Sequence, residues 1–301
     1  MSVTATSKLI NPHNYDDVAH VAKWLQSRLA INSVKKPEIL LICGSGLGSI
    51  GDRVEVVHSV PYSEIPGFPV GSVHGHKGCL LYGQWNGRHV LCMQGRVHAY
   101  EGDAEHVPLC TLPIRVAQQL GVHTIAMTSA VGALNDAYHV GDLMLVNDHL
   151  SLSALARNGP LVGYNDARIG PRFLPGTDLY DATLRKLAHR VAAEDGIHLH
   201  EGVYGQTGGP QFETPAELRW FQLAGVDVVG MSVAHETLVA RHCGVRVLAI
   251  ALITNICQMD ADAEQTGESL HDEVLTAGQT AAERTSRFFE RFVKAIDTNE
   301  T

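Results

Sequence analysis

The chain has 301 residues, of which 45% are hydrophobic and 18% charged, as in an ordinary globular protein that can bury a large core. Its net charge of −9, with no run rich in lysine or arginine, argues against a nucleic-acid binder. The polar N-terminal residues carry no apolar signal region and no stretch reaches membrane-spanning length, so we expect a cytoplasmic protein with no membrane partner.

The six cysteines include no Cys-x-x-Cys pair, and most of them lie in apolar runs. We therefore expect buried free thiols and no disulfide framework. No internal repeat, low-complexity tract or linker divides the chain. The expectation is one domain over residues 1–301, with flexible ends at 1–14 and 296–301.

Helical and strand-like patterns alternate along the chain. The expected helices cover 17–29, 109–120, 183–194, a segment beginning after Thr214, 234–242 and 271–294. The expected strands cover 38–43, 80–85, 89–94, 124–129, 143–147, 228–229 and 245–253. Asn86-Gly87 between two of these strands is a strong hairpin signal, which requires an antiparallel pair. The predicted class is therefore α/β with a mixed sheet, not a purely doubly wound one.

The first candidate site is the glycine-rich segment 44–48, which follows a buried strand. Closely spaced glycines expose backbone N–H groups that suit an anion, but they also suit a simple tight turn. Gly46, Gly48 and Gly51 formally satisfy a dinucleotide-binding fingerprint. Residues 52–59 show no convincing helix, however, and that fingerprint requires one.

The second candidate site is the segment 94–102 after the hairpin. Strand alternation would place Arg96, His98 and Tyr100 on one side of the chain. An arginine fork and a histidine donor suit phosphate, and a tyrosine can lie against a sugar. The alternative is a solvated strand end.

The third candidate site is the segment 208–214, which precedes a helix that Thr214 and Glu217 are expected to cap. Phe212 can stack on a planar ligand while Glu213 accepts from ring N–H groups. A glycine turn with an anchored phenylalanine and a solvated glutamate is the alternative.

Smaller signals are weaker alone. Capping of the next helix explains Ser232 well enough, and residues 128–133 fit ordinary small-residue packing. Thr254-Asn255 stands at the carboxyl end of a strand, where ligands commonly bind. Metal binding is disfavoured, because His235-Glu236 lacks the second histidine of the zinc-protease motif. The pairs His74/His76 and His198/His200 have no further ligand at suitable spacing.

The order of these motifs resembles one family. The motifs are Gly-Ser-Gly-Leu-Gly at 44–48, Gln-Gly-Arg-Val-His-Ala-Tyr-Glu-Gly at 94–102, Gly-Gly-Pro-Gln-Phe-Glu-Thr at 208–214, Gly-Met-Ser at 230–232 and Thr-Asn at 254–255. Together they resemble the trimeric, 6-oxopurine class of purine nucleoside phosphorylases, from about residue 36 to 290. The 94–102 and 208–214 blocks are specific to this family and its methylthioadenosine-phosphorylase relatives.

The resemblance implies a single α/β domain, with a distorted mixed sheet surrounded by helices, that forms a homotrimer with the active site near the subunit interface. It implies reversible phosphorolysis of inosine, guanosine and their deoxy forms to free base and (deoxy)ribose 1-phosphate, as in purine salvage. Orthophosphate is a co-substrate, and no metal or organic cofactor is expected.

The resemblance also assigns residues. The phosphate ligands would be Ser45, His76, Arg96, His98, Ser232 and the Ala130 backbone. The ribose would contact Tyr100, Met231 and His271, and the base would contact Phe212, Glu213 and Asn255. The catalytic residues would be Asn255, Glu213, His98 and His271. An asparagine at position 255, where the adenine-specific relatives have aspartate, implies 6-oxopurine substrates.

Several positions depart from the family pattern. Ser129 replaces an asparagine, Val131 and Ala133 replace smaller residues, and segment 233–235 lacks the usual Thr-Val-Pro. Ile169 replaces a phenylalanine that the neighbouring subunit would supply. We interpret Ser129, Val131 and Ile169 as an altered lid that can admit unusual bases; harmless covariation is the alternative.

Three other functions compete with this hypothesis. A methylthioadenosine phosphorylase would have aspartate at 255 and a small apolar residue at 271. A dinucleotide-binding oxidoreductase would need a second parallel strand where the hairpin lies. A non-catalytic purine-binding homologue would fit the altered segments, but the retained Arg96, His98, Glu213 and Asn255 argue against it.

Overall fold

The computed structural model describes residues 10–31, 35–73, 75–102, 106–260 and 267–296. The strands are β1 (Ile39–Cys43), β2 (Glu55–Pro61), β3 (Cys79–Trp85), β4 (Arg88–Gln94), β5 (Thr124–Ala133), β6 (Leu143–Ser151), β7 (Leu199–Gln206), β8 (Val228–Gly230) and β9 (Arg246–Ile256). The helices are α1 (Tyr15–Arg28), α2 (His106–Leu109), α3 (Leu112–Leu120), α4 (Leu152–Leu155), α5 (Ala182–Glu194), α6 (Pro215–Leu223), α7 (Ala234–His242) and α8 (Gly267–Ala295). Three 3-10 helices are η1 (Gly48–Arg53), η2 (Tyr62–Glu64) and η3 (Ala99–Glu101).

The strands form one nine-stranded sheet in the order β2-β3-β4-β1-β5-β8-β7-β6-β9. The predicted hairpin is present, with β3 and β4 antiparallel and Trp85 opposite Arg88. Parallel pairs join β1 to β4 and to β5, so the sheet is mixed. An additional β5–β9 pairing closes the second half of the sheet on itself. The prediction of a distorted mixed α/β sheet is confirmed.

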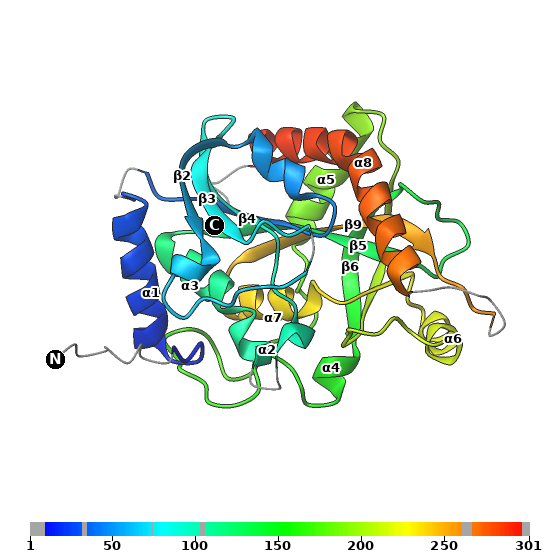
Figure 1. Ribbon diagram of the computed structural model, residues 1–301, viewed down its shortest axis with the longest axis horizontal. Coiled ribbons are helices and arrows are strands. Elements are labelled where there is room, and N and C mark those ends of the chain that lie inside the picture. Colours follow the sequence, from blue (N-terminus) through cyan, green and yellow to red (C-terminus); the bar gives the residue numbers. More distant parts are fainter. Residues whose placement is uncertain (1–9, 32–34, 74, 103–105, 261–266, 297–301) are drawn as a thin grey trace.

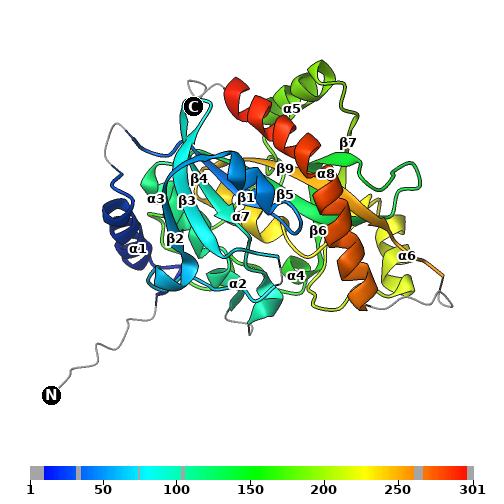
Figure 2. The ribbon, with the colours of Figure 1, turned by 45° about the horizontal axis from the view of Figure 1, so that its top comes forward.

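Helices cover both faces of the sheet, because its central strands are apolar on both sides. In β1, Leu40 and Ile42 face a core that includes α1, α3 and α7, while Leu41 and Cys43 face a core that includes α5 and α8. Figures 1 and 2 show α5 and α8 together on one side of the sheet. Each fully buried aliphatic side chain stabilises the fold by about 1.5–3 kcal/mol, so this double burial holds the strand ends in place.

The helix ends follow local chemistry. The side chain of Asn14 accepts from the Asp17 N–H at the start of α1, and the expected Thr214–Glu217 capping box begins α6. The helix predicted over 109–120 is present as α3, but it begins at Leu112, with Pro113 in its first turn, and Leu109 is the last residue of the separate helix α2. A proline cannot donate the backbone hydrogen bond that a continuous helix would need there.

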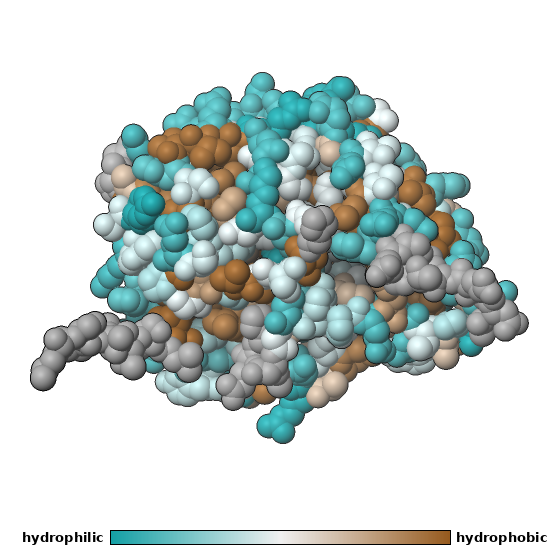
Figure 3. All heavy atoms as spheres, in the orientation of Figure 1, coloured by the Kyte–Doolittle hydropathy of each residue, from teal (hydrophilic) through white to brown (hydrophobic). Residues whose placement is uncertain are grey.

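The face of the molecule in Figure 3 is mostly polar. It carries separate apolar areas among polar side chains. No helix in the described ranges is both long enough and apolar enough to cross a membrane. Flexible ends were expected at 1–14 and 296–301, and of these, residues 1–9 and 297–301 lie outside the described residues. Ile10 and Ile296, which are described, are buried.

Candidate active site

One cavity of about 440 Å³ gathers nearly all the predicted site residues. It lies where β5, β8 and β9 end and where α8 begins. Its lining includes the predicted residues Ser45, Arg96, His98, Tyr100, Ala130, Phe212, Glu213, Met231, Ser232, Asn255 and His271. His76 is not among the lining residues, but it contacts Ser45. Segments 44–48, 94–102, 208–214, 230–232 and 254–255 therefore meet in space.

The glycine loop packs closely at one end of this cavity. A Cβ atom at Gly44 would lie 2.7 Å from the Thr128 carbonyl oxygen and 3.0 Å from Arg96 Nη1. Gly46 has φ +74°, a conformation that favours glycine. The dinucleotide-binding alternative is wrong, because the loop continues into the short η1 and then β2, which is antiparallel to β3.

This packing predicts different effects at two glycines of one segment. Gly44→Ala should lower kcat/KM by about tenfold or more, because the new methyl group would crowd the Thr128 carbonyl oxygen and Arg96 Nη1, so both must shift. Gly48→Ala should have little effect, since a Cβ there meets nothing within 4 Å. Steady-state kinetics of both variants test this, and equal losses would contradict it.

Arg96 is buried, with 2% of its surface exposed. Its Nε and Nη2 donate to the two carboxylate oxygens of Glu236 at 3.0 and 3.1 Å, and Nη1 donates to the Thr128 carbonyl oxygen at 2.5 Å. A guanidinium carries five N–H groups, so one N–H on each of Nη1 and Nη2 has no partner among these contacts. These two groups suit a bidentate anion.

Ser45 and His76 lie at the same end of the cavity as the glycine loop and Arg96, which we call the anion end. His76 Nδ1 lies 2.9 Å from the Arg96 carbonyl oxygen, which can only accept, so Nδ1 carries the proton. Burial, followed by the neighbouring His98, lowers the pKa of His76 to about 4 and keeps the ring neutral. Nε2 therefore accepts from the Ser45 hydroxyl at 3.2 Å. This hydrogen bond fixes the position of the Ser45 side chain within the glycine loop.

His98 and Tyr100 lie beside each other in the cavity. Their rings stack with centroids 4.8 Å apart. The predicted reason, strand alternation, is wrong: β4 ends at Gln94, and Tyr100 lies in η3. The Glu101 carboxylate is 3.1 Å from His98 Nδ1. Burial opposes the charge of Glu101, yet hydrogen bonds from His98 and Ser72 lower its pKa to about 2, so it accepts from Nδ1 and leaves Nε2 for a ligand.

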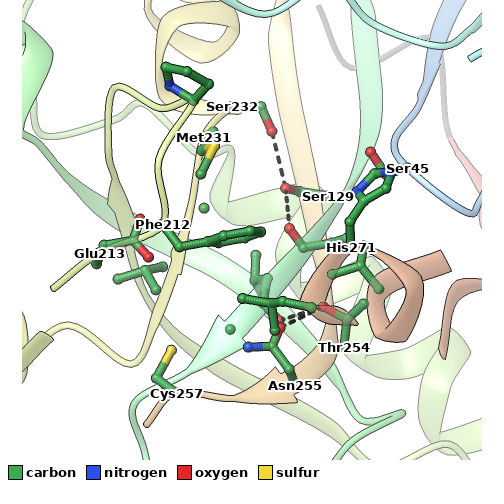
Figure 4. Close-up of a pocket in the computed structure, with 18 of the residues that line it drawn as sticks. Ser45, Ser129, Phe212, Glu213, Met231, Ser232, Thr254, Asn255, Cys257 and His271 are labelled. Atoms are coloured by element: carbon green, nitrogen blue, oxygen red, sulfur yellow. Dashed lines mark hydrogen bonds between the residues drawn. The ribbon is translucent and has the colours of Figure 1, made fainter. Parts of the chain in front are cut away.

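Three hydroxyl groups meet at the edge of the anion end. Ser129 Oγ lies 3.1 Å from Ser232 Oγ (Figure 4). It also lies 3.3 Å from the buried Tyr204 hydroxyl. Tyr204 OH also accepts from the Ser232 N–H at 3.2 Å. The suggestion that Ser232 caps α7 is wrong, because Val233 occupies the cap position. Sequence reasoning missed Tyr204, whose role depends on a contact between distant strands.

The opposite end of the cavity carries groups for a planar ligand. Figure 4 shows the Phe212 ring projecting into the cavity, with Glu213 beside it. Thr207 Oγ1 donates to Glu213 Oε1 at 2.6 Å, which leaves Oε2 for a ligand donor. Burial raises the pKa of Glu213 despite that hydrogen bond. A carboxylate so placed can accept from a ring N–H or exocyclic amine.

Asn255 supplies the donor at this end. Its Oδ1 accepts from Thr254 Oγ1 at 3.1 Å, a hydroxyl shared with the Val131 carbonyl oxygen at the same distance. Nδ2 is then the amide group directed to the cavity (Figure 4). Cys257 also lines this end, and burial raises the pKa of its thiol to about 12. From the sequence we expected Cys257 only to be a buried free thiol.

Of the remaining predicted positions, all but one line the cavity. Met231 and His271 line the cavity (Figure 4). Ser129 and Val131, interpreted as an altered lid, belong to β5 and line the wall. Ile169 is not among the lining residues and packs against the core of its own chain.

Possible metal ligands are few. The part of the chain that the structure describes holds no group of three or more His, Cys, Asp or Glu side chains arranged to bind a metal. The His198 and His200 rings pack edge to face, and His200 pairs with Asp142 at 3.1 Å. His74 lies outside the described residues.

Comparisons with known proteins agree on one family. The model of the phosphorylase superfamily matches residues 38–294. Purine nucleoside phosphorylase of Bos taurus is 42% identical over 292 residues, covering 96% of this chain and 98% of the relative. Purine nucleoside phosphorylase 1 of Geobacillus stearothermophilus is 43% identical over 286 residues, covering 95% and 98%. Purine nucleoside phosphorylase of Schistosoma mansoni, solved with adenosine, has a TM-score of 0.87 at 40% identity, covering 95% of this chain and 99% of that one; its inosine complex has a TM-score of 0.86 at 40% identity, covering 95% and 98%.

Proposed function

Since the chain belongs to the purine nucleoside phosphorylases of the phosphorylase superfamily, we propose that its cavity cleaves 6-oxopurine nucleosides with orthophosphate. The observation that carries this proposal is the division of one cavity into an anion end and a base end. Ser45, Arg96, His98 and Ser232 line the first, and Phe212, Glu213 and Asn255 line the second. The products are the free base and (deoxy)ribose 1-phosphate, as in purine salvage.

The residue types at each end match the charge that develops in this reaction. Cleavage of the C–N bond makes the sugar cationic and the departing purine anionic. Asn255 Nδ2 donates to N7 of the leaving group, and Glu213 accepts from N1–H. Tyr100, Met231 and His271 hold the ribose between the two ends. Orthophosphate, fixed by Arg96 and its neighbours with help from the Ala130 backbone and His76, stabilises the sugar cation and attacks C1′.

No cofactor is required by this scheme, because phosphate is the nucleophile and the side chains supply the donors and acceptors. The 6-oxopurine preference follows from Asn255, whose amide nitrogen offers a donor to O6 or N7. The Schistosoma mansoni relative has been crystallised with adenosine as well as with inosine. The preference for 6-oxopurines must therefore be tested directly by comparing these two nucleosides.

The decisive experiment measures base release from a panel of nucleosides with and without phosphate. We expect hypoxanthine from inosine and guanine from guanosine only when phosphate is present, with adenosine much slower. Phosphate-independent release would make the enzyme a hydrolase. Release of adenine alone would contradict the assignment of Asn255.

We also propose a cytoplasmic homotrimer of one-domain subunits. The segment around 155–173 exposes several large apolar side chains, with Phe173 87% and Leu155 75% exposed, and an apolar patch formed by them would suit an interface. Ile169 belongs to this segment, so a neighbouring subunit can approach it there. Light scattering should give a mass of three chains, and a monomeric mass would contradict the trimer.

A further inference from the structure

Glu236 lies outside the residues assigned to the reaction, although it touches two parts of the anion end. It is buried in the first turn of α7. In the sequence it stood out only as part of the His235-Glu236 pair, which does not complete a zinc motif. A buried carboxylate needs partners to offset the loss of water. The identity and geometry of those partners indicate what it does.

The first partner is Arg96, which comes from the loop after β4. Both carboxylate oxygens accept from its Nε and Nη2 at 3.0 and 3.1 Å. This contact uses one edge of the guanidinium plane, so it fixes the direction of the two N–H groups left for phosphate. Rotation of the guanidinium would break both hydrogen bonds.

The second partner is a strained turn that carries Ser232. Val233 has φ 76° and ψ −58°, and the Ala234 N–H donates to the Ser232 carbonyl oxygen at 3.0 Å, as in a γ-turn. A β-branched residue adopts this conformation only when its surroundings enforce it. Glu236 Oε2 accepts from the Val233 N–H at 3.0 Å and thereby holds the turn.

We propose that Glu236 is a positioning residue that sets Arg96 and the Ser232 turn in one geometry for orthophosphate. Arg96 and the Ser232 turn belong to different segments, and Arg96 is 140 residues from Glu236 in the sequence. The Glu236 carboxylate accepts hydrogen bonds from both. Glu236 does not itself line the cavity, so it acts through these neighbours. The inference rests on the proposed phosphate role of Arg96 and Ser232.

The test is Glu236→Gln, which keeps the shape but presents an amide N–H₂ to one of the donors. We expect the KM for phosphate to rise by about tenfold or more, because small misplacements of a binding group have large kinetic costs. The KM for inosine should change by less than about threefold, since the base end is untouched. A general loss of folding would raise neither constant selectively.

Two further variants keep the test decisive. Asp195→Asn is the matched control, because Asp195 is also a buried carboxylate paired with arginines, Arg287 and Arg291, away from the cavity. It should leave the ratio of the two KM values unchanged. Glu236→Asp keeps the charge but shortens the reach, and it should show the same selective rise if Glu236→Gln does not fold.

Equal changes in both KM values, or no change, would overturn the positioning role. If the unaltered enzyme releases base without phosphate, the proposed function and this inference both fail. If the unaltered enzyme depends on phosphate but Glu236→Gln behaves like it, only this inference fails.

Discussion

Asn255→Asp is expected to shift the substrate preference of the enzyme toward adenosine. The substitution replaces Nδ2 by a carboxylate oxygen, which repels O6 of inosine. The hydrogen bond that Nδ2 donates to N7 is lost. Loss of one donor to developing charge typically lowers kcat by about 10²–10³-fold, so kcat/KM for inosine should fall by that order. Adenosine offers an exocyclic amine where inosine offers O6, so a carboxylate can accept from it. The ratio of kcat/KM for adenosine over inosine should therefore rise.

Parallel assays on adenosine and inosine, with Asn255→Ala as the control, measure this effect. The alanine variant lacks the donor but adds no acceptor, so both substrates should become poorer together. The hydrogen bond from Thr254 Oγ1 survives in the aspartate variant, because an aspartate oxygen can take the place of Oδ1. An unchanged adenosine-to-inosine ratio in Asn255→Asp would remove Asn255 from the base site.

The sequence indicated the fold and most of the cavity because both depend on local signals. The Asn86-Gly87 turn identified the antiparallel hairpin, and the Thr214–Glu217 pair identified the start of α6. The order of the short motifs then indicated the family. Strand alternation, the reason for expecting Arg96, His98 and Tyr100 together, was wrong. Arg96, His98 and Tyr100 reach one cavity through a loop and a 3-10 turn, because Gly95, with φ 102°, follows the end of β4.

What the sequence did not indicate depends on contacts between distant segments. Glu236 is 140 residues from Arg96, and Tyr204 is 75 residues from Ser129. The sequence shows a glutamate in the first turn of helix 234–242 but not that it is buried, and only burial implies that a charged side chain is paired. No comparable signal marked Cys257, which reaches the base end only because β9 continues beyond residue 253.

Glu213→Gln is expected to separate activity from stability. The glutamine retains an oxygen that can accept from Thr207, but the remaining position becomes an amide N–H₂ that opposes N1–H of a 6-oxopurine. We expect kcat/KM for inosine to fall by about 10²-fold, the usual effect of losing one well-placed polar contact. Glu217→Gln is the matched control: it removes the same charge four residues along the chain and keeps a capping side chain, so its activity should stay within about twofold.

The raised pKa of Glu213 gives this prediction its pH dependence and its sign. Because burial raises the pKa above the value in the unfolded chain, the folded protein binds the proton more tightly, and the charged carboxylate destabilises the fold as pH rises through that pKa. The glutamine carries no charge, so thermal unfolding of the ligand-free variant should show a higher Tm at pH 7, and the difference should shrink as pH is lowered. Activity runs the other way: the unaltered enzyme should lose inosine cleavage as Glu213 is protonated, and the variant should lack that acid limb. A variant that is both less stable and equally active would show that Glu213 supports the fold and not the substrate.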